Sequence, residues 1–295
     1  MNIGFLFSIL AGFVWSLVNV VDKTVVSKFI RNPIFIIIVF CITSLVIGLI
    51  TLPFLQFDLH GWAWGWLFIS SFSYTLANLL YYYALKRDEP SRIIPLFSLS
   101  AIFLVFLSAI FLGEIFNFKT YLGIFIIIAG SVIITMRKNI RGAFASKSLW
   151  LMVLSCFGFA VVAVINKYLL NSYSYWQIFG FQRVIVGLIG IFFIIFFFSN
   201  IKQSYQQIKK KYIILNSLAE TMNLLGALLF LVAISFWYVT LANTIVSVQY
   251  VFVFLWALII SRFKPSLFSE EVSRQVIFQK IAAIILIIGG VFLIS

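Results

Sequence analysis

Long apolar stretches, separated by short polar segments, run along the whole chain. No charged residue occurs between Ile93 and Leu112, and twenty residues in a helix are about as long as a bilayer core is thick. A charged turn at residues 86–90 precedes this stretch, and another apolar stretch ends just before the turn at Leu85. The two stretches predict a transmembrane hairpin. The same pattern predicts ten helices along the chain, at residues 3–21, 34–53, 62–84, 93–112, 120–136, 148–166, 175–198, 212–236, 239–261 and 277–294.

Composition agrees with a membrane protein. The chain is 63% hydrophobic and only 10% charged, whereas soluble domains carry about 25% charged residues. We therefore expect an all-α integral membrane protein. A net charge of +13 would suggest nucleic-acid binding in a soluble protein. Here the basic residues lie in short loops with no soluble domain behind them, so we interpret them as charges that orient the helices and expect no nucleic-acid partner.

The positive charges are distributed unevenly between the two sides of the predicted bundle. Of 21 Lys and Arg residues, 18 lie in the loops that follow the first, third, fifth, seventh and ninth helices. The opposite side has Lys119 and Lys167, and Arg183 lies inside a helix. Because basic loops face the cytoplasm, this asymmetry predicts a multi-pass protein of the cytoplasmic membrane with both termini on the outer side.

The two halves of the chain resemble each other. Five helices in each half are an odd number, so the second half must enter the membrane in the opposite orientation. We therefore predict two inverted five-helix repeats, at residues 1–142 and 143–295, an architecture typical of secondary transporters that bind substrate at mid-depth. Corresponding segments lie at offsets of 144, 152 and 160 residues: Asp22-Lys23 with Asn166-Lys167, Ser91–Leu96 with Asn243–Val248, and Gly130 with Gly290.

Several short motifs, in this order and spacing, resemble the drug/metabolite transporter superfamily in its branch with two EamA-type domains. The resemblance covers essentially the whole chain. An arginine equivalent to Arg183 is missing from the first half, and Arg262-Phe-Lys-Pro stands where a second Gly-Glu pair would be. The motifs are Trp15 to Lys23, Tyr83-Ala84-Leu85 to Pro95-Leu96, Leu112-Gly113-Glu114, Gly123 with Ala129-Gly130, and Phe181-Gln182-Arg183.

The resemblance implies a ten-helix exporter or importer of small metabolites. It also implies a central cavity lined by the first, third, fourth, sixth, eighth and ninth helices. It does not identify the substrate.

Two ionisable residues lie at membrane depth, where charged side chains are costly and usually functional. Glu220 lies about 12 Å into the eighth helix at a rise of about 1.5 Å per residue, and Arg183 lies about as deep in the seventh, entered from the other face. Either the two residues form an ion pair that holds these helices together, or Glu220 faces the cavity and exchanges a proton with the solution.

Neutral polar residues inside the predicted helices, several of them at helical spacing, provide further candidates for substrate binding. Cavities combine apolar and aromatic walls with a few convergent polar groups. The alternative for each of these residues is a hydrogen bond between helices, which is common in membrane bundles. Together with Glu220, the candidates are Trp15, Asn19, Asn78, Tyr82, Ser98, Asn223 and Gln249.

Two charged positions at helix ends are predicted to be structural. Glu114 ends the fourth helix, and we expect it to anchor the neighbouring turn. Asp22 and Lys23 end the first helix, and we expect them to pair at the membrane interface.

The sequence favours a secondary transporter that works by alternating access on an amino acid, an amine or a related solute, with export as the expected direction. Proton coupling is an open alternative. The chain has one histidine and no hydrolase or nucleotide-binding motif, so we expect no enzyme activity, cofactor or metal. The second hypothesis is a flippase or carrier of a lipid-linked or nucleotide sugar, and an intramembrane transferase is the third. Expected partners are the small-molecule substrate and membrane lipid, with the protein as a monomer or weak homodimer.

Overall fold

The computed structural model describes residues 2–22, 29–30, 32–87, 93–135, 147–263 and 274–294. Within these ranges the chain is helical and has no strand. The elements are α1 (Ile3–Val21), α2 (Pro33–Thr51), η2 (Leu52–Phe54), α3 (Gly61–Arg87), η3 (Ile94–Ser98), α5 (Leu99–Leu112), α6 (Phe118–Thr135), α7 (Lys147–Leu169), α8 (Tyr175–Gln207), α9 (Lys210–Phe236), α10 (Val239–Val246), α11 (Gln249–Phe263) and α12 (Arg274–Ile294).

Local sequence explains where several helices begin and end. The side chain of Asn2 caps α1, and Asn32 caps α2, whose first residue is Pro33. Ser174 and Gln177 form a reciprocal capping box at the start of α8. The α5 helix ends at Gly113, which adopts φ of 69°, a left-handed conformation that favours glycine.

Six helices in the described part of the chain are long and apolar enough to cross a membrane. Three further apolar helices are shorter, and α3 is the most polar of the long ones. Large apolar side chains also face outward, with Ile110 73% and Phe292 77% exposed. A surface of this kind suits lipid rather than water. The chain is therefore a multi-pass membrane protein.

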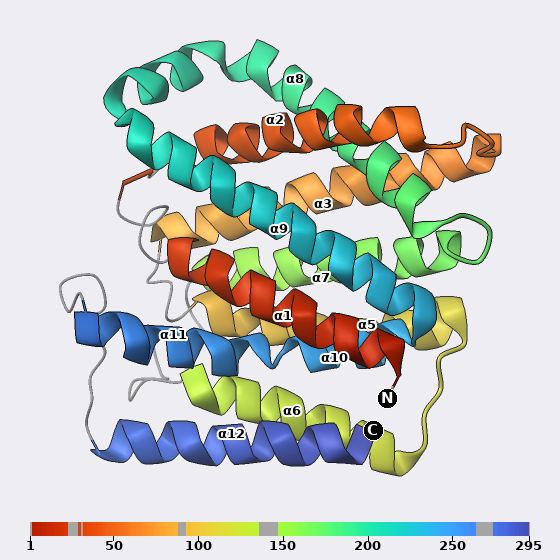
Figure 1. The fold of residues 1–295 in the computed structure, drawn as a ribbon, viewed down its shortest axis with the longest axis vertical. Coiled ribbons are helices and arrows are strands. Elements are labelled where there is room, and N and C mark those ends of the chain that lie inside the picture. The colour runs from red at the N-terminus through yellow and green to blue at the C-terminus, as the bar shows by residue number, and fades with distance from the viewer. Residues whose placement is uncertain are drawn as a thin grey trace.

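The helices lie side by side across the molecule, and both ends of the chain lie at the same side of the bundle (Figure 1). The most extensively packed pairs are α6 with α12, α2 with α8, α3 with α7, and α1 with α9. The α2–α8 pair and the α6–α12 pair form the two ends of the long axis, and the other helices lie between them (Figure 1).

Small residues allow the closest helix contacts. A Cβ atom on Gly290 of α12 would lie 2.8 Å from the carbonyl oxygen of Gly123 in α6, and one on Gly130 would lie 3.0 Å from the carbonyl oxygen of Ala283. Helices in membranes often associate through glycines in this way, because backbones then approach closely. The α6–α12 pair thus depends on Gly123, Gly130 and Gly290.

Three predicted segments differ from the structure. The loop expected at 199–211 is mostly helical, because α8 continues to Gln207 beyond a kink at Phe197. The ninth predicted helix is two helices, since α10 ends at Val246 and α11 starts at Gln249. The fourth begins as a 3₁₀ helix at Ile94–Ser98. The break and the 3₁₀ segment occupy matching positions in the two halves, at the 152-residue offset.

Candidate functional site

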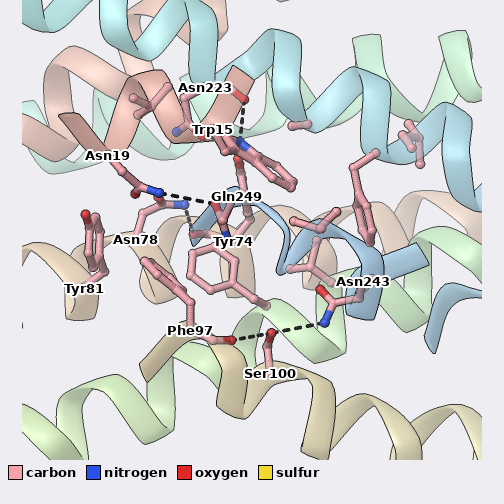
Figure 2. Close-up of a pocket in the computed structure, with 18 of the residues that line it drawn as sticks. Trp15, Asn19, Tyr74, Asn78, Tyr81, Phe97, Ser100, Asn223, Asn243 and Gln249 are labelled. Atoms are coloured by element: carbon pink, nitrogen blue, oxygen red, sulfur yellow. Dashed lines mark hydrogen bonds between the residues drawn. The ribbon is translucent and has the colours of Figure 1, made fainter. Parts of the chain in front are cut away.

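A cavity of about 170 Å³ lies in the middle of the bundle. All six predicted helices that were expected to line the cavity contribute residues to it, and α8, the seventh predicted helix, lines it as well. Polar side chains from several helices meet there, as Figure 2 shows for Asn19, Asn78 and Gln249. The residues that line the cavity include Trp15, Asn19, Asp22, Tyr74, Asn78, Tyr81, Tyr82, Phe97, Ser100, Asn166, Phe179, Gln182, Arg183, Asn223, Ala227, Asn243, Ser247, Gln249 and Tyr250.

The contact between α1 and α9 is built around Trp15. Its indole Nε1 donates to the Asn223 carbonyl oxygen at 3.2 Å and to the Asn223 side-chain oxygen at 3.0 Å (Figure 2). Gly226 lies beneath the ring, and a Cβ atom there would come within 2.6 Å of Nε1. The absence of a side chain at Gly226 therefore leaves room for the indole between the two helices.

Glu220 lies behind this wall, with 2% of its surface exposed. Its carboxylate accepts a hydrogen bond of 2.6 Å from the Tyr82 hydroxyl and one of 3.2 Å from the Asn223 amide. Glu220 does not line the cavity itself. Tyr82 and Asn223 do, so they connect the carboxylate to the cavity.

A second carboxylate does line the cavity. Asp22, at the end of α1, accepts a hydrogen bond of 2.8 Å from the Tyr81 hydroxyl. Adjacent tyrosines of α3 thus each donate to a buried acid, one on α1 and one on α9. The predicted pairing of Asp22 with Lys23 falls outside the described residues, because Lys23 is not among them.

Polar contacts also join α1 to α11 and α5 to α10. The Asn19 amide donates to the Gln249 side chain at 3.3 Å, and the Asn243 amide donates to the Ser100 hydroxyl at 3.3 Å (Figure 2). Asn78 instead donates to the Tyr74 carbonyl of its own helix at 2.8 Å. Side chains from both halves of the chain therefore meet across the cavity.

Arg183 of α8 lines the cavity with 1% of its surface exposed. Its Nη2 donates to the Gln182 side-chain oxygen at 2.7 Å, while Nε and Nη1 have no hydrogen-bond partner in the described chain. The guanidinium carbon lies 4.7 Å from the ring centroid of Tyr74 and 5.3 Å from that of Phe179. These are cation–π distances.

The ion pair between Arg183 and Glu220, one of the two alternatives that the sequence leaves open, does not form. The Glu220 carboxylate is turned toward Tyr82 and Asn223, and the guanidinium is held by Gln182. Gln182 is itself fixed, because its amide donates to Ser70 at 2.7 Å and to Asn166 at 3.4 Å. Each charged group is thus fixed by neutral polar neighbours.

Glu114 and Lys167 hold the turn between α9 and α10. The Glu114 carboxylate accepts hydrogen bonds from the backbone N–H groups of Val239 and Thr240 at 2.8 and 3.1 Å, and from the Thr240 hydroxyl at 2.8 Å. Lys167 donates to the carbonyls of Ile234 and Trp237 at 2.7 and 3.0 Å. An acid at a helix start and a base at a helix end suit the helix dipoles. Glu114 therefore anchors the neighbouring turn, as the sequence predicts.

Most predicted site residues converge on this cavity. Ser98 does not line it, and Glu220 reaches it only through its neighbours. Sequence reasoning missed Tyr74, although it lies one turn before Asn78, and Gln182, which is adjacent to Arg183. Helical spacing could have identified Tyr74, whereas Gln182 shares only the motif of Arg183 and not its helix face. The predicted residues that line the cavity are Trp15, Asn19, Asn78, Tyr82, Arg183, Asn223 and Gln249.

Comparisons with known proteins agree with this architecture. Residues 2–136 match the EamA-like transporter family, which confirms for this part of the chain the resemblance seen in the sequence. An "Uncharacterized transporter in cobO 3'region" from a Sinorhizobium species is 30% identical over 79 residues, which are 27% of this chain. The match spans 56% of that relative's length. A solved crystal structure of another protein shares the fold, with a TM-score of 0.71 and 13% identity over 99% of this chain and 95% of that one.

Proposed function

We propose that this membrane protein, whose first half matches the EamA-like transporters, is a secondary transporter that moves a small metabolite through its central cavity by alternating access. The observation that carries the proposal is the cavity itself, in which polar side chains from both halves of a membrane bundle converge. Binding at mid-depth between two halves is what alternating access requires. We propose the cytoplasmic membrane as its location, both termini on the outer side, and export as the direction.

The helix pairing supports two inverted repeats, at residues 1–142 and 143–295. If the nth helix of one half corresponds to the nth of the other, α1 corresponds to α7 and α3 to α9. The α3–α7 contact then corresponds to the α1–α9 contact, and both are among the most extensive in the bundle. The α2–α8 and α6–α12 pairs each join corresponding helices. A two-fold axis between the halves accounts for this pattern.

The size and charge of the cavity favour a small metabolite over a lipid-linked or nucleotide sugar. A cavity of about 150 Å³ accommodates a molecule the size of benzene, and this one has about 170 Å³. A sugar diphosphate needs several cationic groups. Among the described residues that line the cavity, Arg183 is the one basic side chain.

Uptake into vesicles reconstituted with the purified full chain tests the proposal. Radiolabelled amino acids, amines, small carboxylic acids and nucleotide sugars are offered with and without a pH gradient. We expect saturable uptake of at least one small solute and none of the nucleotide sugars. Uptake of nucleotide sugars alone would favour the carrier alternative, and no uptake of any solute would refute the transport proposal.

A further inference from the structure

We propose that Arg183 is the binding subsite for a carboxylate group of the transported solute. The inference rests on the proposed transport function, because it names the chemical class that the cavity selects. It commits to small carboxylic acids, with or without an amino group, rather than amines, amides or uncharged solutes.

The first argument is that Arg183 has unused donors. A guanidinium has five N–H groups in a planar fork that matches a carboxylate. Gln182 accepts one hydrogen bond from Nη2, whereas Nε and Nη1, which carry three N–H groups between them, have no partner in the described chain. The side chain lines the cavity, while Nε and Nη1 themselves are covered, so an anion in the cavity would reach these donors once the side chains that cover them move aside.

The second argument is that no protein carboxylate balances the guanidinium. Arg183 forms no ion pair within the part of the chain that the structure describes. The nearby acids are engaged elsewhere, Glu220 with Tyr82 and Asn223, and Asp22 with Tyr81. Burying an unpaired charge is costly, so a bound carboxylate would supply the missing partner.

The third argument is that the guanidinium is held in place before any ligand arrives. Gln182 is fixed by Ser70 on α3 and Asn166 on α7, so three helices determine where Nη2 points. The rings of Tyr74 and Phe179 lie close to the guanidinium carbon. A preorganised donor loses less freedom on binding, which favours a fixed anion site over a mobile surface contact.

A single guanidinium in about 170 Å³ also limits the kind of anion. Phosphate esters carry up to two charges and are usually bound by several donors. One carboxylate, in contrast, can be bound by the N–H groups of a single guanidinium. The cavity therefore suits a small monocarboxylate, and polar groups such as Asn19, Asn78 and Gln249 line the space for the rest of the solute.

The test compares carboxylic acids with their primary amides. The thermal unfolding midpoint of the purified full chain is measured against C3–C8 carboxylic acids, with and without a 2-amino group, and against the amide of each. We expect at least one acid to raise the midpoint and its amide to leave it unchanged. In Arg183→Gln we expect about 10- to 100-fold weaker binding of that acid, the loss of one or two charge-assisted hydrogen bonds.

Two variants separate binding from folding. Arg183→Lys keeps the charge but loses the fork, and we expect it to bind the acid with intermediate affinity. Ser44→Ala removes a fully buried hydroxyl outside the cavity, also without a hydrogen-bond partner in the described chain, and we expect wild-type binding. If Arg183→Gln does not fold, the carboxylate subsite is still tested by Arg183→Lys and by the comparison of acids with amides in the wild type.

The results also distinguish this inference from the transport proposal. Stabilisation by amides as strong as by acids, no stabilisation by any acid, or unchanged acid binding in Arg183→Gln would each refute the carboxylate subsite. Vesicle uptake of amines or amides, undiminished in Arg183→Gln, would refute the subsite and leave the transport function intact. Absence of uptake of every solute would refute the transport function.

Discussion

The turn between α9 and α10 and the central cavity both bury charged side chains, but they use them differently. At the turn, Glu114 accepts three hydrogen bonds and Lys167 donates two, and every one of them goes to α9, α10 or the turn between them. In the cavity, Arg183 keeps Nε and Nη1 without a partner in the described chain. Charges of the first kind stabilise the scaffold, and a charge of the second kind is available to a ligand.

This difference separates two kinds of functional candidate that the sequence presents alike. Glu114 and Arg183 both belong to motifs that resemble the same family, and both are almost fully buried. They differ in their hydrogen bonds, because the Glu114 carboxylate is fully engaged and two nitrogens of Arg183 have no partner in the described chain. We therefore expect changes at the turn to lower stability, and changes at the cavity to alter transport in a protein that still folds.

The largest effect is expected from Glu220→Gln. If transport is coupled to protons through Glu220, uptake driven by a pH gradient should be abolished while exchange of labelled for unlabelled solute persists, because a neutral amide cannot release a proton. The amide keeps the size of the carboxyl and can still accept from Tyr82, so folding should be retained. Gradient-driven uptake at the wild-type rate in this variant would contradict a coupling role for Glu220.

Glu114→Ala should lower stability most. It leaves the N–H groups of Val239 and Thr240 without their acceptor, and the loss of charge-assisted hydrogen bonds amounts to about 3 kcal/mol. The thermal unfolding midpoint in detergent measures this. Glu114→Gln keeps one acceptor oxygen and should lose less. A midpoint equal to that of the wild type in Glu114→Ala would show that the turn does not depend on this carboxylate.

Gly290→Leu should separate α6 from α12. The new side chain would meet Ile127 at 2.6 Å and the Gly123 carbonyl at 2.8 Å, and overpacking of this kind costs about 1–3 kcal/mol. The adjacent Gly289→Ala is the control, because nothing lies within 4 Å of a Cβ atom there. We expect a lower unfolding midpoint for the first variant only. Equal midpoints would contradict the close contact of these helices.

The smallest effect is expected at Asn216. This fully buried residue of α9 has neither amide atom hydrogen-bonded in the described chain. Replacing it by leucine, which has the same number and branching of side-chain heavy atoms, should raise stability by about 1 kcal/mol, since an unsatisfied buried polar group is removed. A lower unfolding midpoint in Asn216→Leu would instead indicate that the amide is satisfied in the membrane.

The apolar runs predicted nearly every helix because lipid-spanning length leaves a clear signal in the sequence. Two of the three segments that differ from the structure carry no local signal for the difference. Neither residues 198–207 nor residues 239–263 contain a proline or glycine, so no local signal indicates that α8 continues to Gln207 or that the helix breaks at Ser247. The extension of α8 is held by a tertiary contact, the hydrogen bond of 2.7 Å from Asn32 to Ser204.

Helical spacing also identified much of the cavity, because residues one turn apart share a face. Ser98, predicted only as a polar residue of the fourth helix, does not line the cavity and lies in a 3₁₀ helix, which has three residues per turn rather than 3.6. Its neighbours Phe97 and Ser100 line the cavity instead. Contacts between helices, such as Asn243 with Ser100, depend on packing angles that spacing along one helix does not contain.

One measurement tests the central role of the cavity most directly: uptake of a transported solute by vesicles that contain Ala227→Trp or Leu225→Trp. Ala227 lines the cavity, whereas Leu225, two residues earlier on α9, is 47% exposed at the bundle surface. An indole at position 227 would fill much of the cavity, and we predict that it abolishes uptake while the variant at position 225 transports normally. Normal uptake by folded Ala227→Trp would contradict transport through this cavity.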